Sequence, residues 1–187
     1  MGMKVMIGRW LGLVALLALA PGCSTGRLTA AREEAHKDIP IGNRVAVLIF
    51  HNETAAPEAG RVLAELFTTE MKAHTKLKVS DFSLVAAAME TIEFEAGTLL
   101  NVGELGEKLN AQTVITGTVS EYRYRRSLGE APAVGLTVHV IDVASGKELW
   151  TASGYEEGGR ILSYRGSLSE IAQKLCLNVV LELDDDL

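Results

Sequence analysis

The sequence predicts a single α/β domain in which helices pack against a mixed β-sheet. Three observations predict it. Residues 44–50 form a short continuous apolar run, which is typical of a strand buried on both faces. An apolar helical stripe and a second short apolar segment follow, so residues 44–79 indicate a β-α-β unit. Three later segments, rich in β-branched residues and separated by turn signals, indicate an antiparallel meander.

The β-α-β unit begins with the strand at 44–50, which a polar loop at 51–54 follows. Pro57 is expected to open the helix at a first-turn position, where its missing N–H costs nothing, and Glu58 favours the helix N-terminus. The apolar stripe of this helix consists of Val62, Leu63, Leu66, Phe67 and Met71. A short strand at 77–79 completes the unit.

Two further helices are expected before the meander. Residues 83–91 are rich in alanine and indicate the first of them. Asn101 is followed three residues later by Glu104, a spacing similar to a capping box, and this predicts a short helix that carries Leu105 and Leu109.

The meander is expected to comprise strands at 113–124, at 134–140 and from Leu149 onward. Residues 134–140 alternate between apolar and small or polar side chains, so one face of that strand should lie in the core. Gly146 lies in the turn at 142–148, where a positive φ is needed. Ser167 and Glu170 form a capping-box pattern ahead of an amphipathic closing helix.

The first 22 residues differ in composition from the rest of the 187-residue chain. They contain two basic residues, no acidic residue and an apolar run at 10–20, which is the order of a secretory signal and is short for a membrane span. Without this segment the formal charge falls from −6 to −8, because both removed charges are positive. An acidic chain of this kind excludes a general nucleic-acid binder, which needs a concentrated positive surface.

Residues 19–26 read Leu-Ala-Pro-Gly-Cys-Ser-Thr-Gly, and this arrangement resembles the lipobox of bacterial lipoproteins. The resemblance implies that Cys23 carries diacylglycerol and becomes the acylated first residue, and Ser24 resembles an outer-membrane sorting signal. The alternative is an ordinary secretory signal with a coincidental cysteine. We expect a signal peptide at 1–22, a lipidated N-terminus and flexible tether at 23–42, and a domain at 43–187. Nineteen tether residues reach roughly 60 Å when extended.

No motif of an enzyme active site is present in the sequence, and we expect a non-catalytic protein without a cofactor. There is no nucleophile elbow, phosphate loop, dinucleotide fingerprint or Cys-x-x-Cys pair. The four histidines (His36, His51, His74 and His139) lack the spacing of helical metal ligands, so no metal site is expected. His139 is interpreted as a surface or satisfied histidine rather than a general base. Cys176 is interpreted as a small buried hydrophobe rather than a reactive thiol.

The most unusual local composition is at residues 121–126, Glu-Tyr-Arg-Tyr-Arg-Arg. On a strand, Tyr122 and Tyr124 would share one face, and Arg123 and Arg125 the other. One interpretation is an edge strand whose arginines discourage aggregation between sheets. The other is a partner-binding surface that includes Arg126, because Tyr and Arg dominate protein interfaces. Both interpretations remain open from the sequence.

Several segments, taken in order, match a known pattern. They are residues 45–50 with Asn52 and Thr54, residues 57–60, residues 114–119, and residues 142–150 with their glycine and tryptophan. Over about residues 43–183 the chain resembles the periplasmic lipoprotein superfamily that includes the penicillin-binding-protein activator LpoB and the curli secretion channel CsgG. The resemblance implies a non-catalytic α/β domain, anchored to the outer membrane and facing the periplasm.

Two functions follow from that resemblance. The first is a binding or regulatory lipoprotein, most specifically an activator of a peptidoglycan synthase. The alternative is a structural or secretion-assembly component of the cell envelope, for which homo-oligomers are expected. In both cases the implied partners are the membrane, through Cys23, and a protein of the cell envelope.

Overall fold

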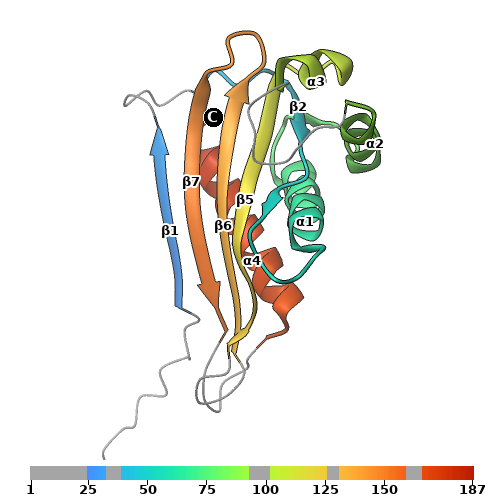
Figure 1. The fold of residues 1–187 in the computed structure, drawn as a ribbon. Helices are drawn as coiled ribbons and strands as arrows, with labels where there is room; N and C mark the ends of the chain where they lie inside the picture. The colour runs from blue at the N-terminus through green and yellow to red at the C-terminus, as the bar shows by residue number, and fades with distance from the viewer. Residues whose placement is uncertain (1–24, 33–38, 93–101, 126–130, 159–165) are drawn as a thin grey trace, which may run out of the picture.

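The computed structural model describes residues 25–32, 39–92, 102–125, 131–158 and 166–187 (Figure 1). In chain order, the elements are β1 (Thr25–Arg32), β2 (Arg44–Val47), β3 (His51–Asn52), α1 (Ala59–His74), β4 (Lys78–Val79), α2 (Phe82–Ile92), α3 (Val102–Lys108), β5 (Thr113–Arg125), β6 (Ala131–Asp142), β7 (Glu148–Glu157) and α4 (Leu168–Asp185). In this part of the chain all strands join one sheet in the order β1-β7-β6-β5-β2-β4, and β3 pairs with β5.

The predicted mixed α/β fold is confirmed. β2 runs parallel to both β4 and β5, so the β-α-β unit forms as the apolar periodicity predicts. β5, β6 and β7 form the predicted antiparallel meander. Gly146 lies in the β6–β7 turn with φ of +68°, the left-handed conformation that glycine adopts without steric cost.

Helices cover the two faces of the sheet unequally (Figure 1). α1 and α4 lie on one face and enclose the main core, to which Phe50, Phe67, Leu136, Trp150 and Leu175 contribute large buried side chains. α2 and α3 cover only the upper part of the other face, over a smaller cluster that contains Leu48, Val114 and Ile141. The rest of that second face, on β5, β6 and β7, has none of the described helices over it; we call it the open face.

Local side-chain bonds set the loop before α1 and the start of α4. The Asn52 side chain donates to the Ala56 carbonyl at 2.7 Å and accepts from the Thr54 N–H at 3.0 Å, which organises the loop after β3. α1 then begins at Ala59 with Glu58 as N-cap, two residues later than the expected start at Pro57. Ser167 and Glu170 form both bonds of the predicted capping box at α4. The expected cap at residue 101 lies outside the described residues.

Part of the segment 23–42, for which a flexible tether is expected, forms β1 in the structure. Residues 25–32 pair with β7 along eight registers, from Thr25 opposite Glu157 to Arg32 opposite Trp150. Without β1, one edge of the ten-residue β7 would present unpaired backbone groups, and pairing satisfies them. Ile39 is also buried and donates to the Asp186 carbonyl, so the folded unit begins before the expected residue 43. Among the described helices, none is long and apolar enough to cross a membrane.

Candidate functional site: the Tyr–Arg end and the open face

A β-bulge sets which way the Tyr–Arg segment faces. Val119 pairs with Leu136 and Glu121 with Gly135, so Ser120 is an extra residue on β5. Beyond the bulge, Glu121, Arg123 and Arg125 lie on the open face, while the two tyrosines lie on the α4 face. The segment lies where β5 ends, β6 begins, β7 ends and β1 begins (Figure 1). We call this the Tyr–Arg end of the sheet.

The two tyrosines contact α4 and the core beneath it. Tyr122 packs against the main core, and burial raises the pKa of its phenol, an effect that its hydrogen bond to Ser169 partly offsets. The Tyr124 hydroxyl accepts from the Leu168 N–H at 3.2 Å, at the first turn of α4. Tyr124 nevertheless remains 47% exposed. The tyrosines therefore secure the start of α4, and one of them also reaches the surface.

The arginines on the open face share one carboxylate. Glu121 accepts from Arg123 Nε at 2.9 Å, from Arg125 Nε at 2.8 Å and from Arg125 Nη2 at 2.6 Å. The Arg125 hydrogen bond is the main cause that lowers the pKa of Glu121. The Arg125 guanidinium also lies over the Tyr155 ring, 5.4 Å from its centroid. Arg125 is thus fixed by two neighbours, whereas the Arg123 side chain is 67% exposed.

Tyr155 completes this cluster from β7. Its hydroxyl donates to Glu157 Oε2 at 3.2 Å, and burial followed by the Glu157 charge raises the pKa of the phenol. Gly135 on β6 pairs with both Glu121 and Tyr155, so a residue without a side chain lies between them. This allows the long side chains of β5 and β7 to meet across β6.

A second polar cluster lies higher on the open face. His139 Nδ1 lies 2.6 Å from Glu148 Oε2 and 3.2 Å from the Thr151 hydroxyl. Below it, the Thr137 and Ser153 hydroxyls lie 3.0 Å apart. The hairpin register, which pairs His139 with Thr151, brings Glu148 within reach and supplies a carboxylate partner for the histidine.

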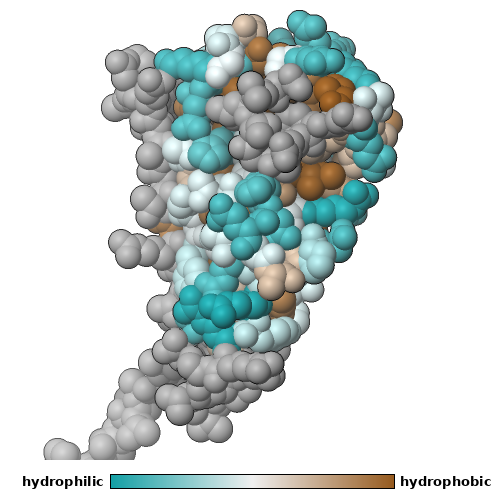
Figure 2. Space-filling model, viewed as in Figure 1, coloured by the Kyte–Doolittle hydropathy of each residue, from teal (hydrophilic) through white to brown (hydrophobic). Residues whose placement is uncertain are grey.

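The hydropathy of the molecular surface agrees with the position of these two polar clusters. Figure 2 shows polar side chains over the middle of the open face and hydrophobic ones at the upper right, over α2 and α3. Among the described residues, no group of three or more His, Cys, Asp or Glu side chains could hold a metal ion. Cys176 is fully buried, and burial raises the pKa of its thiol to about 12, as expected of a buried hydrophobe. The site therefore offers a surface of hydrogen-bonding and ionic groups.

Four of the six predicted site residues lie together at the Tyr–Arg end: Tyr122, Arg123, Tyr124 and Arg125. Cys23 and Arg126 lie outside the described residues. Residues 121–125 pair with β6 on one side, and no described strand pairs with their other side, so the edge-strand interpretation holds for this part of β5. Sequence reasoning missed Glu121 as the shared acceptor and Tyr155 as the stacking partner, because both depend on cross-strand register.

The chain is similar to several solved structures, although it matches no protein-family model and no curated protein sequence. The PelC dodecamer from Paraburkholderia phytofirmans is 25% identical with a TM-score of 0.62; the match covers 87% of this chain and 98% of that chain. Lipoprotein GNA1162 from Neisseria meningitidis is 18% identical with a TM-score of 0.58, over 75% of this chain and 96% of that one. The latter similarity establishes the shared fold alone.

The superfamily expected from the sequence is also represented. The LpoB C-terminal domain from Salmonella enterica is 18% identical with a TM-score of 0.42, and the match covers 62% of this chain and 82% of that chain. A structural similarity with a TM-score of 0.42 carries no argument about function. The similarity to PelC covers 87% of this chain and 98% of that chain at the higher identity of 25%.

Proposed function

We propose that this protein is a lipid-anchored component of the cell envelope that assembles into a homo-oligomer and works by binding rather than by catalysis. The observation that carries the proposal is the similarity to PelC, which is a dodecamer, over 87% of this chain. The open face supports it, because hydroxyl, ionic and aromatic groups lie on that face of the sheet. This function is the structural or assembly alternative that the sequence also allowed.

The anchor in this proposal is Cys23. The basic start, the apolar run and the small residues before Cys23 support an acylated N-terminus on the outer membrane, with the domain in the periplasm. Replacing Cys23 with Ala should abolish acyl labelling and release the protein from the outer-membrane fraction. Acyl labelling that persists in this variant would contradict the anchor.

Assembly is tested by cross-linking in the native envelope. Closed oligomers repeat one defined interface, so a single ladder that ends at one size is expected. A described surface residue, Ser153 on the open face, can be replaced by Cys to carry a photo-cross-linker, with Thr69 on the outer side of α1 as a second position. If cross-linkers at both positions yield only monomers, the proposed assembly is contradicted.

The second candidate is activation of a peptidoglycan synthase, which the resemblance of residues 43–183 supports. The position of β1 weighs against it, because only Ser24 lies between Cys23 and the sheet, which leaves almost none of the tether expected at 23–42 to extend the reach of the domain. If this function holds, the protein should capture a peptidoglycan synthase and raise its rate of glycan polymerisation. Absence of both effects would leave assembly as the proposed function.

A further inference from the structure

The start of β1 and the Tyr–Arg segment lie in one row across four strands. Thr25 is opposite Glu157, Glu157 is opposite Ala133, and Ala133 is opposite Arg123. Neighbouring strands lie about 4.8 Å apart, so the three steps place the Thr25 and Arg123 backbones about 15 Å from each other. The N-terminal end of the sheet and the Tyr–Arg cluster therefore form one continuous end of the molecule.

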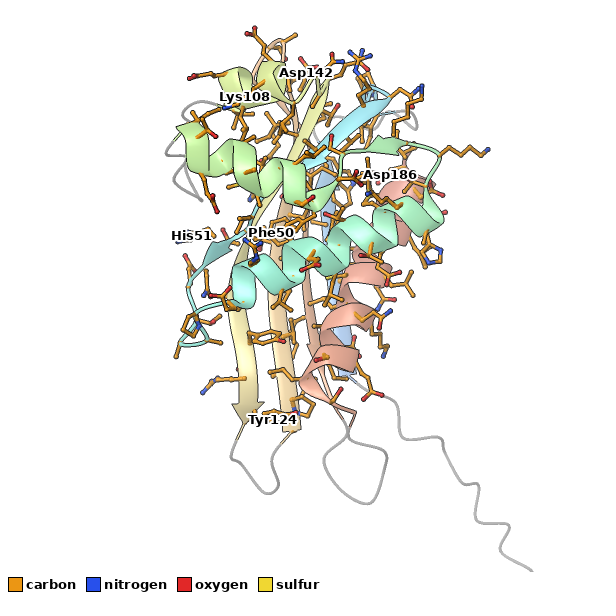
Figure 3. The ribbon with its side chains drawn as sticks, turned by 90° about the vertical axis from the view of Figure 1, so that its right-hand side faces the viewer. Phe50, His51, Lys108, Tyr124, Asp142 and Asp186 are labelled. Atoms are coloured by element: carbon orange, nitrogen blue, oxygen red, sulfur yellow. The ribbon has the colours of Figure 1, made fainter. Side chains whose placement is uncertain are left out.

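The chain before β1 is short. Cys23 precedes Thr25 by two residues, which span at most about 7 Å. A lipid on Cys23 would hold this end of the sheet against the bilayer, because no long tether intervenes. The opposite end, at the β6–β7 turn, lies about 40 Å away along the twelve residues of β6. Figure 3 shows Tyr124 and Asp142 at these two ends.

We propose that the Tyr–Arg end rests on the phospholipid surface that holds the acyl chains of Cys23, with Arg123 and Tyr124 in contact with the headgroups. This placement rests on the proposed anchor at Cys23 and assigns the Tyr–Arg segment a lipid partner. The strands then stand away from the membrane. The open face consequently points sideways, toward neighbouring copies in the membrane plane.

The chemistry of the two side chains suits a headgroup layer. Arg123 uses Nε to bond Glu121, its guanidinium carries two further amino groups, and its side chain is 67% exposed. Guanidinium groups bind phosphate in a bidentate manner. Tyr124, 47% exposed, combines an apolar ring with a hydroxyl, and tyrosine is enriched at membrane interfaces for that reason.

The acidic groups at this end that belong to the described strands are already engaged. Glu121 accepts from both arginines, Glu157 accepts from the Tyr155 hydroxyl, and Glu156 accepts from Lys174 at 2.6 Å. Glu121 and Glu156 each contact a cation that offsets part of their charge, so they repel anionic headgroups less than free carboxylates do. Among the described residues at this end, the exposed Arg123 is thus the cation best placed to meet a phosphate.

The test uses the full chain, expressed in a bacterial host and purified in its acylated form. It is reconstituted into vesicles of phosphatidylethanolamine and phosphatidylglycerol whose headgroups carry a nitroxide quencher. A fluorophore is attached at Tyr124→Cys or, as a matched control, at Ser145→Cys in the β6–β7 turn. Cys176 stays unlabelled because it is buried. We expect strong quenching at position 124 and little at position 145.

The outcomes separate the proposal from the anchor. A protein that fails to acquire acyl chains and to float with the vesicles contradicts the anchor and this placement together. Flotation with no quenching at position 124, or equal quenching at both positions, overturns the placement and leaves the anchor intact. Quenching at position 124 that disappears when the protein oligomerises would assign this end to a second copy and overturn the lipid contact.

A charge variant tests the role of Arg123 directly. With the label at position 124, Arg123→Gln should lower the ratio of membrane-docked to undocked protein roughly fivefold, since one basic residue near an anionic surface contributes about that factor. Lys76→Gln removes the same charge from an exposed position between α1 and β4 and should leave the ratio unchanged. Equal effects of the two variants would reduce the contact to general electrostatics and contradict a specific role for Arg123.

Discussion

The pairing of β1 with β7 makes a prediction that a flexible tether does not. Leu28 is opposite Gly154 and packs, half-buried, against the main core beside α4. A Cβ on Gly154 would approach Leu28 Cδ1 to 3.2 Å and Leu175 Cδ1 to 2.6 Å, so the leucine fills space that the glycine leaves. Leu28→Ala removes three carbons from this contact and should weaken the attachment of β1.

The size of the expected destabilisation follows from the half-burial of Leu28. At about 0.8 kcal/mol per fully buried methylene and half burial, Leu28→Ala costs about 1.2 kcal/mol. Because local opening controls amide exchange, residues 25–32 should exchange about sevenfold faster, while amides of α4 keep their rates. Leu84→Ala on α2, where the leucine is 62% exposed, is the control and should change no rate appreciably.

Hydrogen exchange followed by mass spectrometry measures these rates. Residues 25–32 of the unaltered protein should be protected well beyond an unstructured peptide. Exchange at the rate of a free chain, in both the unaltered protein and the Leu28 variant, would refute the pairing. That result would also restore the flexible tether expected at residues 23–42.

Three further predictions concern stability and reactivity. Glu121→Gln should lower the free energy of unfolding by about 1 kcal/mol at pH 7. The effect is smaller than for a buried charged hydrogen bond, because solvent screens the partly exposed arginine partners. The pKa of Glu121 is lowered in the folded protein, so this loss of stability should be constant above about pH 4.3, the pKa in the unfolded chain, and should shrink as the pH falls through the folded pKa. Urea unfolding at several pH values measures the loss. A loss that does not depend on pH would contradict the prediction. Ser167→Ala should lower the free energy of unfolding by about 1 kcal/mol, because it removes the hydroxyl that accepts from the Glu170 N–H. Ser153→Ala is the exposed control. Equal urea midpoints for the two variants would disprove the prediction. Cys176, with a pKa raised to about 12, should resist iodoacetamide at pH 8 until denaturant is added, and rapid alkylation of the folded protein would show that it is accessible.

Local signals allowed much of the fold to be predicted. The apolar run at 44–50 and the helical stripe of α1 report burial directly, because their periodicity is that of the element itself. The capping box at Ser167 and the turn at Gly146 depend on neighbours within a few residues, so both appear in the structure as the sequence indicated. These features need no knowledge of distant partners.

The features of the fold and the site that the sequence did not predict depend on contacts between residues far apart in the chain. Apart from Leu28, residues 25–32 are polar or small and alternate poorly, and they form β1 because the edge of β7 accepts a partner. The bulge at Ser120 and the meeting of Arg125 with Tyr155 depend on cross-strand register. The alternation of residues 122–125 was readable from the sequence, whereas the carboxylate that holds both arginines was assigned only by the structure.

Homo-oligomeric assembly is tested most directly by native mass spectrometry of the acylated full chain, released from membranes in mild detergent. Assembly predicts one dominant species whose mass is a fixed multiple of the protomer and does not change on dilution. Twelve copies would match the PelC dodecamer to which the chain is similar. A monomer at every concentration, from protein shown to be folded and acylated, would contradict the account.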